Sequence, residues 1–130
     1  EFETLLKMTN NESTQIITQE FIEDIYEGDF RILIIHGKPF KKTLARIPQG
    51  DSFKGNLAAG GKGVVKDISD FQFEMASEIG DFLIQKDINF AGIDVIGNFL
   101  TEINVTSPTC ARQILDQSGE NPIQEYFEKL

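Results

Sequence analysis

Three side chains that carry oxygen ligands stand close together in an otherwise apolar stretch: Asp94, Glu102 and Asn104. Carboxylate and amide oxygens are the ligands that hard cations such as Mg²⁺ prefer. Side chains alternate between the two faces of a strand, so the register of this hairpin decides whether the three meet. A two-residue loop would set Asp94 opposite Thr101 and send Glu102 to the other face. A loop of odd length, such as 97–99, sets Asp94 opposite Glu102, with Asn104 next along the same face.

In the odd-loop register, the other face of this hairpin carries Ile93, Val95 and Ile103, which together make a coherent apolar core. The spacing alone also fits, and by itself favours, a second interpretation, a plain strand pair with one solvated polar face. The sequence pattern therefore defines a candidate cation site and leaves the choice between these two interpretations open.

Arg31 and Arg46 lie within apolar segments, where an unpaired guanidinium is unfavourable. Each needs an anionic partner, which is either an internal carboxylate or a bound ligand. Cys110 is the only cysteine and His36 the only histidine, and nothing in the sequence brings the two together. The lone cysteine cannot form an internal disulfide, which indicates a reducing compartment such as the cytoplasm.

Two further segments offer backbone amides to an anion. The glycine-rich stretch GNLAAGGKG, 55–63, can approach a phosphate closely, but it matches neither the P-loop nor the dinucleotide-binding pattern. A solvated linker is its simpler interpretation. The hydroxyls of Thr106 and Ser107, with the amides of a helix that Pro108 opens, can hold a carboxylate. Ordinary helix capping explains the same residues.

The elements that must position these side chains follow from hydrophobic periodicity and turn signals. Two groups of strands are predicted: an antiparallel meander over 15–23, 30–37 and 43–48, and a hairpin over 89–97 and 99–106. Residues 49–66 are rich in glycine and poor in large apolar side chains, so no regular structure is expected there.

Helices are predicted in the second half of the chain from their capping signals. Ser69 and Gln72 form a capping-box pattern that opens an amphipathic helix through about residue 86. Ser107-Pro108 opens a short helix that Gly119 closes, and Asn121-Pro122 opens a last one through Leu130. The expected fold is therefore α+β, an antiparallel sheet with flanking helices.

Length and composition limit the function classes. The chain has 130 residues, 40% of them hydrophobic and 25% charged, which predicts a single globular domain over 1–130. A net charge of -9 would repel a phosphate backbone, so nucleic acid is not an expected partner. The longest aliphatic run, 32–35, is far shorter than the ~20 residues of a bilayer span, so no membrane role is expected. The chain begins at Glu1 without a methionine or a signal peptide, and reads as a fragment.

Four motifs together resemble the prokaryotic glutathione synthetase family of ATP-grasp ligases: LARIPQG at 44–50, GNLAAGGKG at 55–63, GIDVIG at 92–97 and TEINVTSPTC at 101–110. The resemblance runs from about Gln19 to Arg112 in the same order and spacing. It implies the carboxy-terminal lobe of an ATP-grasp fold. It also implies ATP-dependent ligation of γ-glutamylcysteine to glycine, through an acyl phosphate that the glycine amine attacks.

The resemblance also implies roles for single residues. Asp94, Glu102 and Asn104 correspond to ligands of Mg²⁺, with Mn²⁺ as an alternative, that bridges the ATP phosphates, which favours the cation-site interpretation. The segment that corresponds to the adenine pocket is Gln19, Glu20, Phe21 and Ile22, and Asp29 corresponds to the residue that holds the ribose hydroxyls.

Arg31 and Arg46 correspond to catalytic contacts with the peptide substrate and the acyl phosphate. The further substrate-binding positions are Lys54, Asn56 and Ser107, with Lys54 standing where the family usually carries arginine, so its contact is the least secure. His36 stands where the family is expected to have an acidic residue. Residues 48–63 correspond to a lid over the site.

The main departure from the family is length, because the family chain is more than twice as long. Its amino-terminal domain and lysine-bearing lobe have no counterpart here, so the chain alone is expected to be inactive and its missing half is an expected partner. A homo-oligomer is compatible with the resemblance. Two alternatives stay open: a non-catalytic ATP-grasp-like binding module, and a related ATP-dependent carboxylate–amine ligase.

Overall fold

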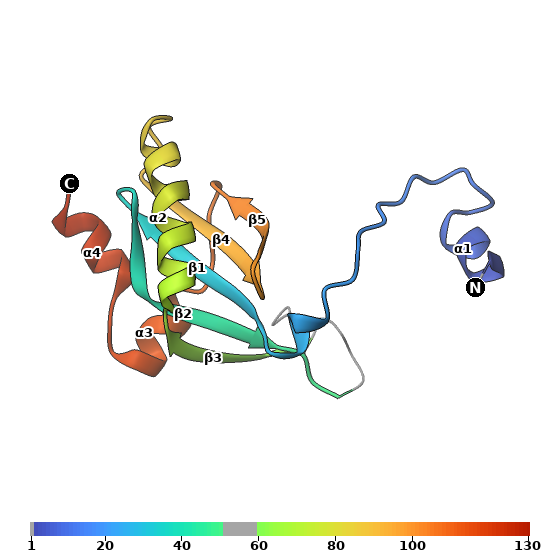
Figure 1. Ribbon diagram of the computed structural model, residues 1–130, viewed down its shortest axis with the longest axis horizontal. Coiled ribbons are helices and arrows are strands. Elements are labelled where there is room, and N and C mark those ends of the chain that lie inside the picture. Colours follow the sequence, from blue (N-terminus) through green and yellow to red (C-terminus); the bar gives the residue numbers. More distant parts are fainter. Residues whose placement is uncertain (1, 51–59) are drawn as a thin grey trace.

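The structure is a computed structural model that describes residues 2–50 and 60–130. Five strands form one antiparallel sheet in the order β3-β2-β1-β4-β5 (Figure 1). The strands are β1 Asp29–Ile35, β2 Lys38–Ile47, β3 Lys62–Asp67, β4 Phe90–Ile96 and β5 Phe99–Asn104. The helices are α1 Phe2–Met8, α2 Asp70–Ile84, α3 Ala111–Ser118 and α4 Pro122–Glu128, with a 3₁₀ turn, η1, at Glu23–Tyr26. The predicted α+β class with an antiparallel sheet is confirmed.

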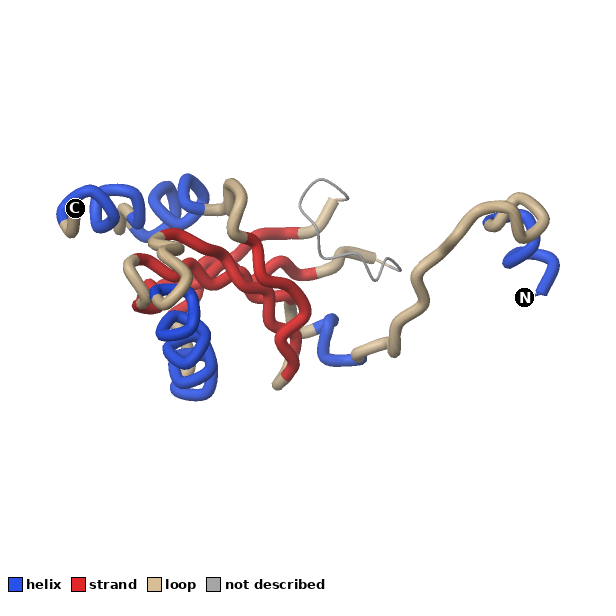
Figure 2. The backbone as a smooth tube through the Cα atoms, turned by 90° about the horizontal axis from the view of Figure 1, so that it is seen from above, coloured by secondary structure: helices blue, strands red, loops and turns tan. Residues whose placement is uncertain are grey.

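Helices pack against both faces of the sheet (Figure 2). Helix α2 covers one face, where Ile32, Ile93 and Ala76 belong to one buried cluster. Helices α3 and α4 lie on the other face, where Leu33 and Ile114 belong to a second cluster. Successive residues of β1 therefore enter opposite cores, which explains why this strand is a continuous apolar run instead of an alternating one.

Helix α2 begins at the predicted capping box. The Ser69 hydroxyl accepts a hydrogen bond from the Gln72 amide at 3.2 Å, and the Gln72 side chain accepts one from the Ser69 amide at 3.1 Å. Further along, α2 packs directly on the turn between β1 and β2, where a Cβ on Gly80 would lie 2.7 Å from the carbonyl carbon of Gly37. The missing side chain at Gly80 therefore sets how closely the helix approaches the sheet.

The hairpin of β4 and β5 turns through two residues, 97–98, because Ile96 pairs with Phe99. The predicted odd-length loop is therefore wrong. Asp94 nevertheless pairs with Glu102, because the register shifts immediately before Val95. The extra residue that this register needs lies in a β-bulge of β5 and not in the loop.

The face opposite Asp94 is only partly the core that was predicted. Ile93 and Val95 are fully buried beneath α2. Ile103 pairs with Ile93 but is 43% exposed, because it lies on the edge strand. Asn104 pairs with Gly92, and so lies next to Glu102 along the site face, as expected.

The strand predicted over 15–23 is absent. Residues 15–22 have no regular structure, and η1 follows directly. The segment is rich in β-branched residues, which favours a strand, but β1 already has β2 on one side and β4 on the other. No position beside β1 remains for this segment, and Ile17 is 89% exposed.

The segments predicted over 30–37 and 43–48 form β1 and a longer β2. They are joined by a turn at His36 and Gly37, both with positive φ, at 47° and 78°. The third strand of the meander is β3, inside the 49–66 stretch where no regular structure was expected. Its half-buried Val64 and Val65 pair with Ala45 and Leu44 of β2, which are fully buried. The edge strand β3 therefore forms against the apolar surface of β2.

Helix α3 begins later than predicted. Ser107 and Cys110 have φ of 86° and 89°, and a residue that caps a helix in the usual way is extended, with negative φ. The segment from Ser107 is therefore irregular, although α3 does end at Gly119. The cap of α4 is as predicted, because the Asn121 side chain accepts from the amide of Ile123 at 3.0 Å.

The two edges of the sheet differ. At the β3 edge, the Gln117 side chain accepts from the Val65 amide at 2.9 Å and donates to the Gly63 carbonyl at 3.1 Å. A single side-chain amide thus satisfies two outward backbone groups of an edge strand, which is one way to protect an edge. β5, the other edge, has no strand on its outer side within the described chain.

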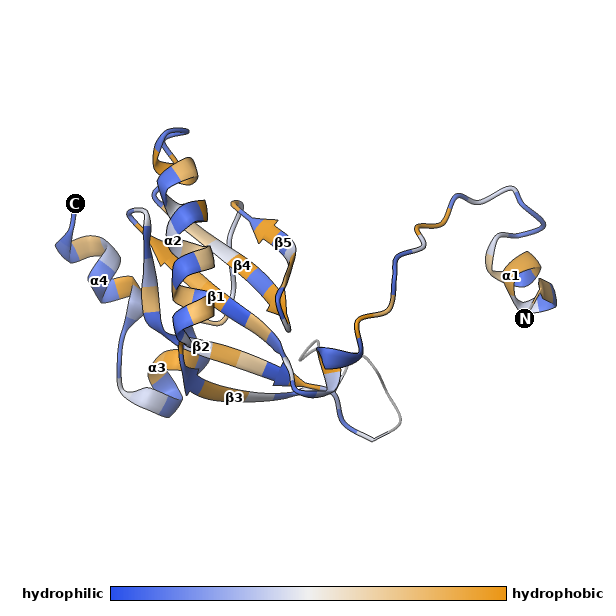
Figure 3. Cartoon of the chain, in the orientation of Figure 1, coloured by the Kyte–Doolittle hydropathy of each residue, from blue (hydrophilic) through white to orange (hydrophobic). Residues whose placement is uncertain are grey.

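Helix α1 lies away from the sheet at the end of an extended segment and buries none of its residues (Figure 1). Hydrophobic and hydrophilic residues alternate along α2 (Figure 3), as expected for a helix with one buried side. Within residues 2–50 and 60–130, no helix combines the length and the apolar character that crossing a membrane requires.

Candidate functional site

A row of charged residues crosses the sheet on the face that carries α3 and α4. Arg31 of β1 pairs with Asp94 of β4, and Asp94 pairs with Glu102 of β5. In the neighbouring row, Asp29 of β1 pairs with Arg46 of β2. Directly opposed residues of an antiparallel sheet present their side chains on one face. Backbone register alone therefore brings these five side chains together.

Both arginines bind Asp94, which is 5% exposed. Arg31 donates to both carboxylate oxygens of Asp94, with Nη2 to Oδ2 at 2.8 Å. Arg46 Nη2 lies 2.7 Å from the same Oδ2 and 2.5 Å from Oδ2 of Asp29. The need for an anionic partner at each arginine is thus met by internal carboxylates, which keeps both guanidinium groups at fixed positions.

Burial affects the charges of this cluster. Burial raises the pKa of Asp29 to about 6, against the lowering effect of Arg46. The hydrogen bond to Asp94 raises the pKa of Arg31, so its guanidinium stays charged. Within this cluster, two buried atoms lack a hydrogen-bond partner, Oδ1 of Asp29 and Nε of Arg46. A buried polar atom without a partner is unfavourable, so each of these atoms would gain from a ligand group that reached it and formed a hydrogen bond.

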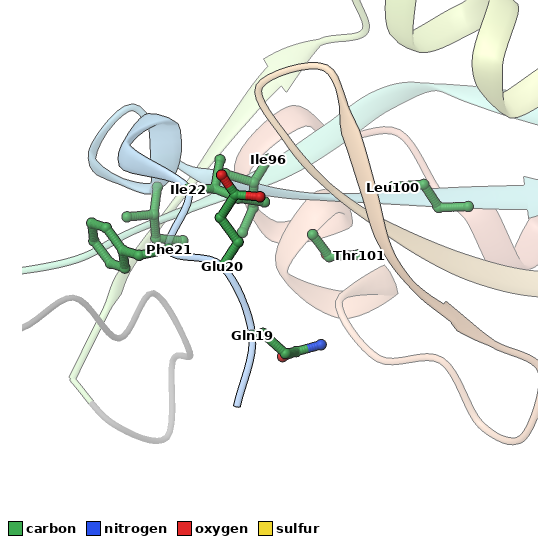
Figure 4. A pocket seen from close by; sticks show the side chains of 8 residues that line it. Gln19, Glu20, Phe21, Ile22, Ile96, Leu100 and Thr101 are labelled. Atoms are coloured by element: carbon green, nitrogen blue, oxygen red, sulfur yellow. The ribbon is translucent and has the colours of Figure 1, made fainter. Parts of the chain in front are cut away.

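A pocket of about 430 Å³ lies between the segment before β1 and the β4–β5 hairpin (Figure 4). Its walls come from the segment before β1 and from the β4–β5 hairpin: Gln19, Glu20, Phe21, Ile22, Ile25, Ile96, Leu100 and Thr101. Apolar side chains with a few polar groups are the usual lining of a small-molecule site.

The pocket and the charged row share the β4–β5 hairpin. Ile96 follows Asp94 by two residues on β4, so both point to the same face of the sheet, and Thr101 directly precedes Glu102 on β5. The pocket wall before β1 is fixed to this hairpin, because a Cβ on Gly97 would overlap the carboxylate of Asp24 in η1.

The family model for "Prokaryotic glutathione synthetase, ATP-grasp domain" matches residues 1–119. The chain belongs to this family. The match spans β1 to β5 and therefore includes both parts of the site, the pocket and the charged row. The family assignment also confirms the resemblance that the sequence motifs indicated.

Three relatives illustrate how far the similarity of this ATP-grasp domain extends. A glutathione synthetase of Xylella fastidiosa strain 9a5c is 45% identical over 123 residues, which cover 95% of this chain and 39% of that protein. Those of Nitrosomonas europaea and Pseudomonas aeruginosa are 49% and 47% identical over 114 and 116 residues, each covering 36% of the relative. The chain therefore spans less than two-fifths of the length of the curated relatives it matches.

The structure brings some of the predicted site residues together and separates others. Arg31, Arg46, Asp94 and Glu102 form the charged cluster, and the segment 19–22 forms a pocket wall. Three predicted residues lie elsewhere or cannot be placed. Ser107 is exposed in the segment between β5 and α3, whereas Lys54 and Asn56, with most of the 48–63 segment, lie outside the described residues.

Asp29 is not in the pocket wall. Its carboxylate binds Arg46, although its backbone pairs with Ile96, which does line the pocket. No sequence pattern indicates this pair, because Asp29 and Arg46 are 17 positions apart and meet only through the β1–β2 register.

The donor set fits a hard divalent cation. Asp94 uses three of about four lone pairs on the arginines, so one on Oδ1 remains. Glu102 is 56% exposed and lies 3.8 Å from Arg31, and Asn104 Oδ1 accepts one hydrogen bond, from Thr106, at 3.0 Å. No group of three or more His, Cys, Asp or Glu side chains within the described ranges forms a metal cluster. Two carboxylates and an amide are therefore the whole candidate set.

Sequence reasoning missed the hairpin side of the pocket. Ile96, Leu100 and Thr101 line it together with Ile25 of η1. The first three lie beside the predicted cation ligands, so proximity along the hairpin was the available signal. Ile25 lies just beyond the strand predicted over 15–23, in a segment for which no element is predicted.

Proposed function

We propose that this chain forms the carboxy-terminal lobe of a glutathione synthetase, which joins γ-glutamylcysteine to glycine with ATP through an acyl phosphate. The observation that carries the proposal is the row Arg31–Asp94–Glu102 next to a pocket that the same β4–β5 hairpin lines. Family membership and the similarity to proteins named glutathione synthetase support it. The chain spans 39% of the Xylella relative, so the remaining parts of the cleft belong to the longer protein.

In this proposal the pocket takes the nucleoside end of ATP. The segment 19–22 contacts the adenine, and Ile96 and Leu100 supply apolar surface for the ring. The ribose lies toward Asp29, whose backbone pairs with Ile96. Its Oδ1 has no donor in the described chain, so it is the acceptor that a ribose hydroxyl would satisfy.

Asp94, Glu102 and Asn104 would hold Mg²⁺ or Mn²⁺ at the phosphate end. When bound, the cation would neutralise negative charge on the transferred phosphoryl group. Asp94 is pre-oriented by two arginines, whereas Glu102 is exposed and free to turn toward a ligand. The hairpin therefore combines a rigid ligand with an adjustable one.

Arg31 and Arg46 would stabilise the negative charge that develops at the acyl phosphate. A donor that is already in place needs no reorganisation during the reaction, and this is the main source of electrostatic catalysis. The unpartnered Nε of Arg46 is the donor still available in this cluster. Ser107, together with Lys54 and Asn56 outside the described residues, would contact the peptide substrate.

The decisive experiment is a chimera that supplies the rest of the cleft. Residues 19–112 of this chain replace the matching residues of the Xylella fastidiosa relative, and glutathione formation and ADP release are measured with γ-glutamylcysteine, glycine and Mg·ATP. The proposal predicts ligation that depends on all three substrates. Glu102→Gln in the chimera should lower kcat by at least about a hundredfold, because a charged cation ligand is lost.

The control variant is Glu78→Gln, which removes an exposed carboxylate on α2, on the face of the sheet away from the site. It should leave kcat unchanged. A folded chimera that releases no ADP, or that ligates a different amine in place of glycine, would refute the glutathione synthetase assignment. The second outcome would favour a related carboxylate–amine ligase.

A further inference from the structure

The register of the β4–β5 hairpin changes by one residue part-way along the two strands. Its two-residue turn pairs Ile96 with Phe99 and Val95 with Leu100. Regular pairing would continue with Thr101 opposite Asp94. The structure instead pairs Asp94 with Glu102, so Thr101 is an extra residue that has no partner of its own on β4.

The bulge decides on which face the candidate cation ligand lies. Without it, Glu102 would pair with Ile93 and point to the α2 face, because a one-residue slip moves every later side chain to the opposite face. Asn104 would move with it. The bulge thus keeps Glu102 beside Asp94.

Thr101 makes two side-chain contacts in addition to supplying the extra residue of the bulge. Its hydroxyl donates to the carbonyl of Asp94 at 3.1 Å, across the strands and at the point of the register shift. Its side chain also lines the pocket, together with Gln19 and Ile96 (Figure 4). One residue therefore touches both the backbone of a candidate cation ligand and the candidate nucleoside pocket.

We infer that Thr101 is a positioning residue that couples the two halves of the site: it fixes the register that sets Glu102 beside Asp94, and it forms part of the nucleoside pocket. The inference rests on the proposed function for the identity of the two ligands. The register itself is independent of that function. A bulge that re-aims a side chain beside a binding site is a known use of this feature.

Three variants of the 130-residue chain separate these roles. Thr101→Val keeps the shape of the side chain and removes the hydroxyl, whereas Thr101→Ser keeps the hydroxyl. Deletion of Thr101 is the matched control, because a regular two-residue hairpin then pairs Asp94 with Glu102 without any bulge. The deletion therefore keeps the ligand register and removes the pocket contact.

Three measurements follow each variant: cross-strand nuclear Overhauser contacts between residues 94 and 102, Mn²⁺ affinity from the spectrum of free Mn²⁺, and adenosine affinity from amide shift changes. Thr101→Val should weaken the 94–102 contacts and lower Mn²⁺ affinity about fivefold, the factor that corresponds to one hydrogen bond of ~1 kcal/mol. Thr101→Ser should restore both. The deletion should keep Mn²⁺ affinity within about twofold and lower adenosine affinity about fivefold or more.

Two results would overturn the inference. One is a Thr101→Val chain with unchanged 94–102 contacts and Mn²⁺ affinity, since the hydroxyl would then hold nothing in place. The other is a deletion that loses Mn²⁺, or that binds adenosine as the parent chain does. If the parent chain binds neither probe, the 94–102 contacts test the register on their own, and the two affinities are measured for the same variants in the Xylella fastidiosa chimera, where the same results decide the inference.

Discussion

Arg31 and Asp94 stand directly opposite each other on β1 and β4, and their side chains form a two-point ion pair in the interior of the sheet, with 4% and 5% exposure. Asp94 also receives Arg46 at 2.7 Å. The same carboxylate is therefore a candidate cation ligand and the internal partner of both arginines. A variant that removes the Asp94 carboxylate would therefore change both the arginine cluster and any cation binding at this position.

Asp94→Asn and Glu102→Gln are expected to differ sharply in stability. Removing the Asp94 charge leaves the buried Arg31 without its close anion and leaves Arg46 with Asp29 alone, which should lower the free energy of unfolding by about 3 to 5 kcal/mol. Glu102 is 56% exposed and only 3.8 Å from Arg31, so Glu102→Gln should change it by less than about 0.5 kcal/mol. Urea unfolding of both variants at pH 7 measures the difference. Equal losses would contradict the description of the cluster.

The stability of the chain should depend on pH through Asp29. Burial raises the pKa of its carboxyl from 3.8 to about 6 in the folded state, so between these values the folded chain binds more protons than the unfolded chain. The free energy of unfolding should therefore fall as the pH rises from about 4 to about 6, and this contribution should be constant above that range.

Asp29→Asn isolates this effect because the variant has no proton to exchange at this position. The free energy of unfolding of the parent chain, minus that of Asp29→Asn, should decrease across pH 4 to 6 in a series of urea titrations. A difference that increases with pH would mean that Arg46, which favours the charged carboxylate, outweighs burial.

Gly80→Ala should reverse the usual effect of this substitution. In the middle of a helix, alanine in place of glycine normally stabilises by about 1 kcal/mol. Here the new Cβ would lie 2.7 Å from the carbonyl carbon of Gly37, which is backbone and unable to move aside alone. We expect a loss of about 1 to 3 kcal/mol. Thermal unfolding should show a lower midpoint for Gly80→Ala, next to an unchanged one for the exposed control Glu78→Ala.

The chain alone should bind Mg·ATP only near or above the millimolar range, about -4 kcal/mol, and should not form glutathione. Orienting the reactants accounts for roughly 7 to 11 kcal/mol of the barrier in a complete site, and this chain spans 39% of its Xylella relative. Its net charge of -9 also disfavours a triphosphate. Calorimetry with Mg·ATP and a coupled ADP-release assay measure both points. Micromolar affinity or turnover would show that this part is sufficient by itself.

The helices show what the sequence predicts well. Ser69 with Gln72, and Asn121 with Pro122, place the beginnings of α2 and α4 correctly, because a cap is a local hydrogen-bonding arrangement. The segment 15–23 shows the limit. Its β-branched residues favour a strand, yet a strand also needs a free neighbour, and the pairing of β1 with β2 and β4 is decided far away in the sequence.

The candidate site was predictable in its ligands and not in its geometry. The pairing of Asp94 with Glu102 was predicted, but through an odd loop, whereas the structure reaches it through an extra residue in β5. A bulge has no clear signature in a single sequence. The Asp29–Arg46 pair depends likewise on the register of β1 and β2, which composition and spacing do not encode.

The amide of Gln117 occupies the hydrogen-bonding positions at Gly63 and Val65 that an added strand would use. β5 is the other edge of the sheet, and no strand of the described chain pairs with its outer side. Within the described chain, Gln117 therefore blocks the addition of a strand at β3, whereas β5 has no strand paired to its outer side. Any strand that joins there would lie directly beside Glu102 and Asn104, so intermolecular pairing and cation binding would compete for the same border of the molecule.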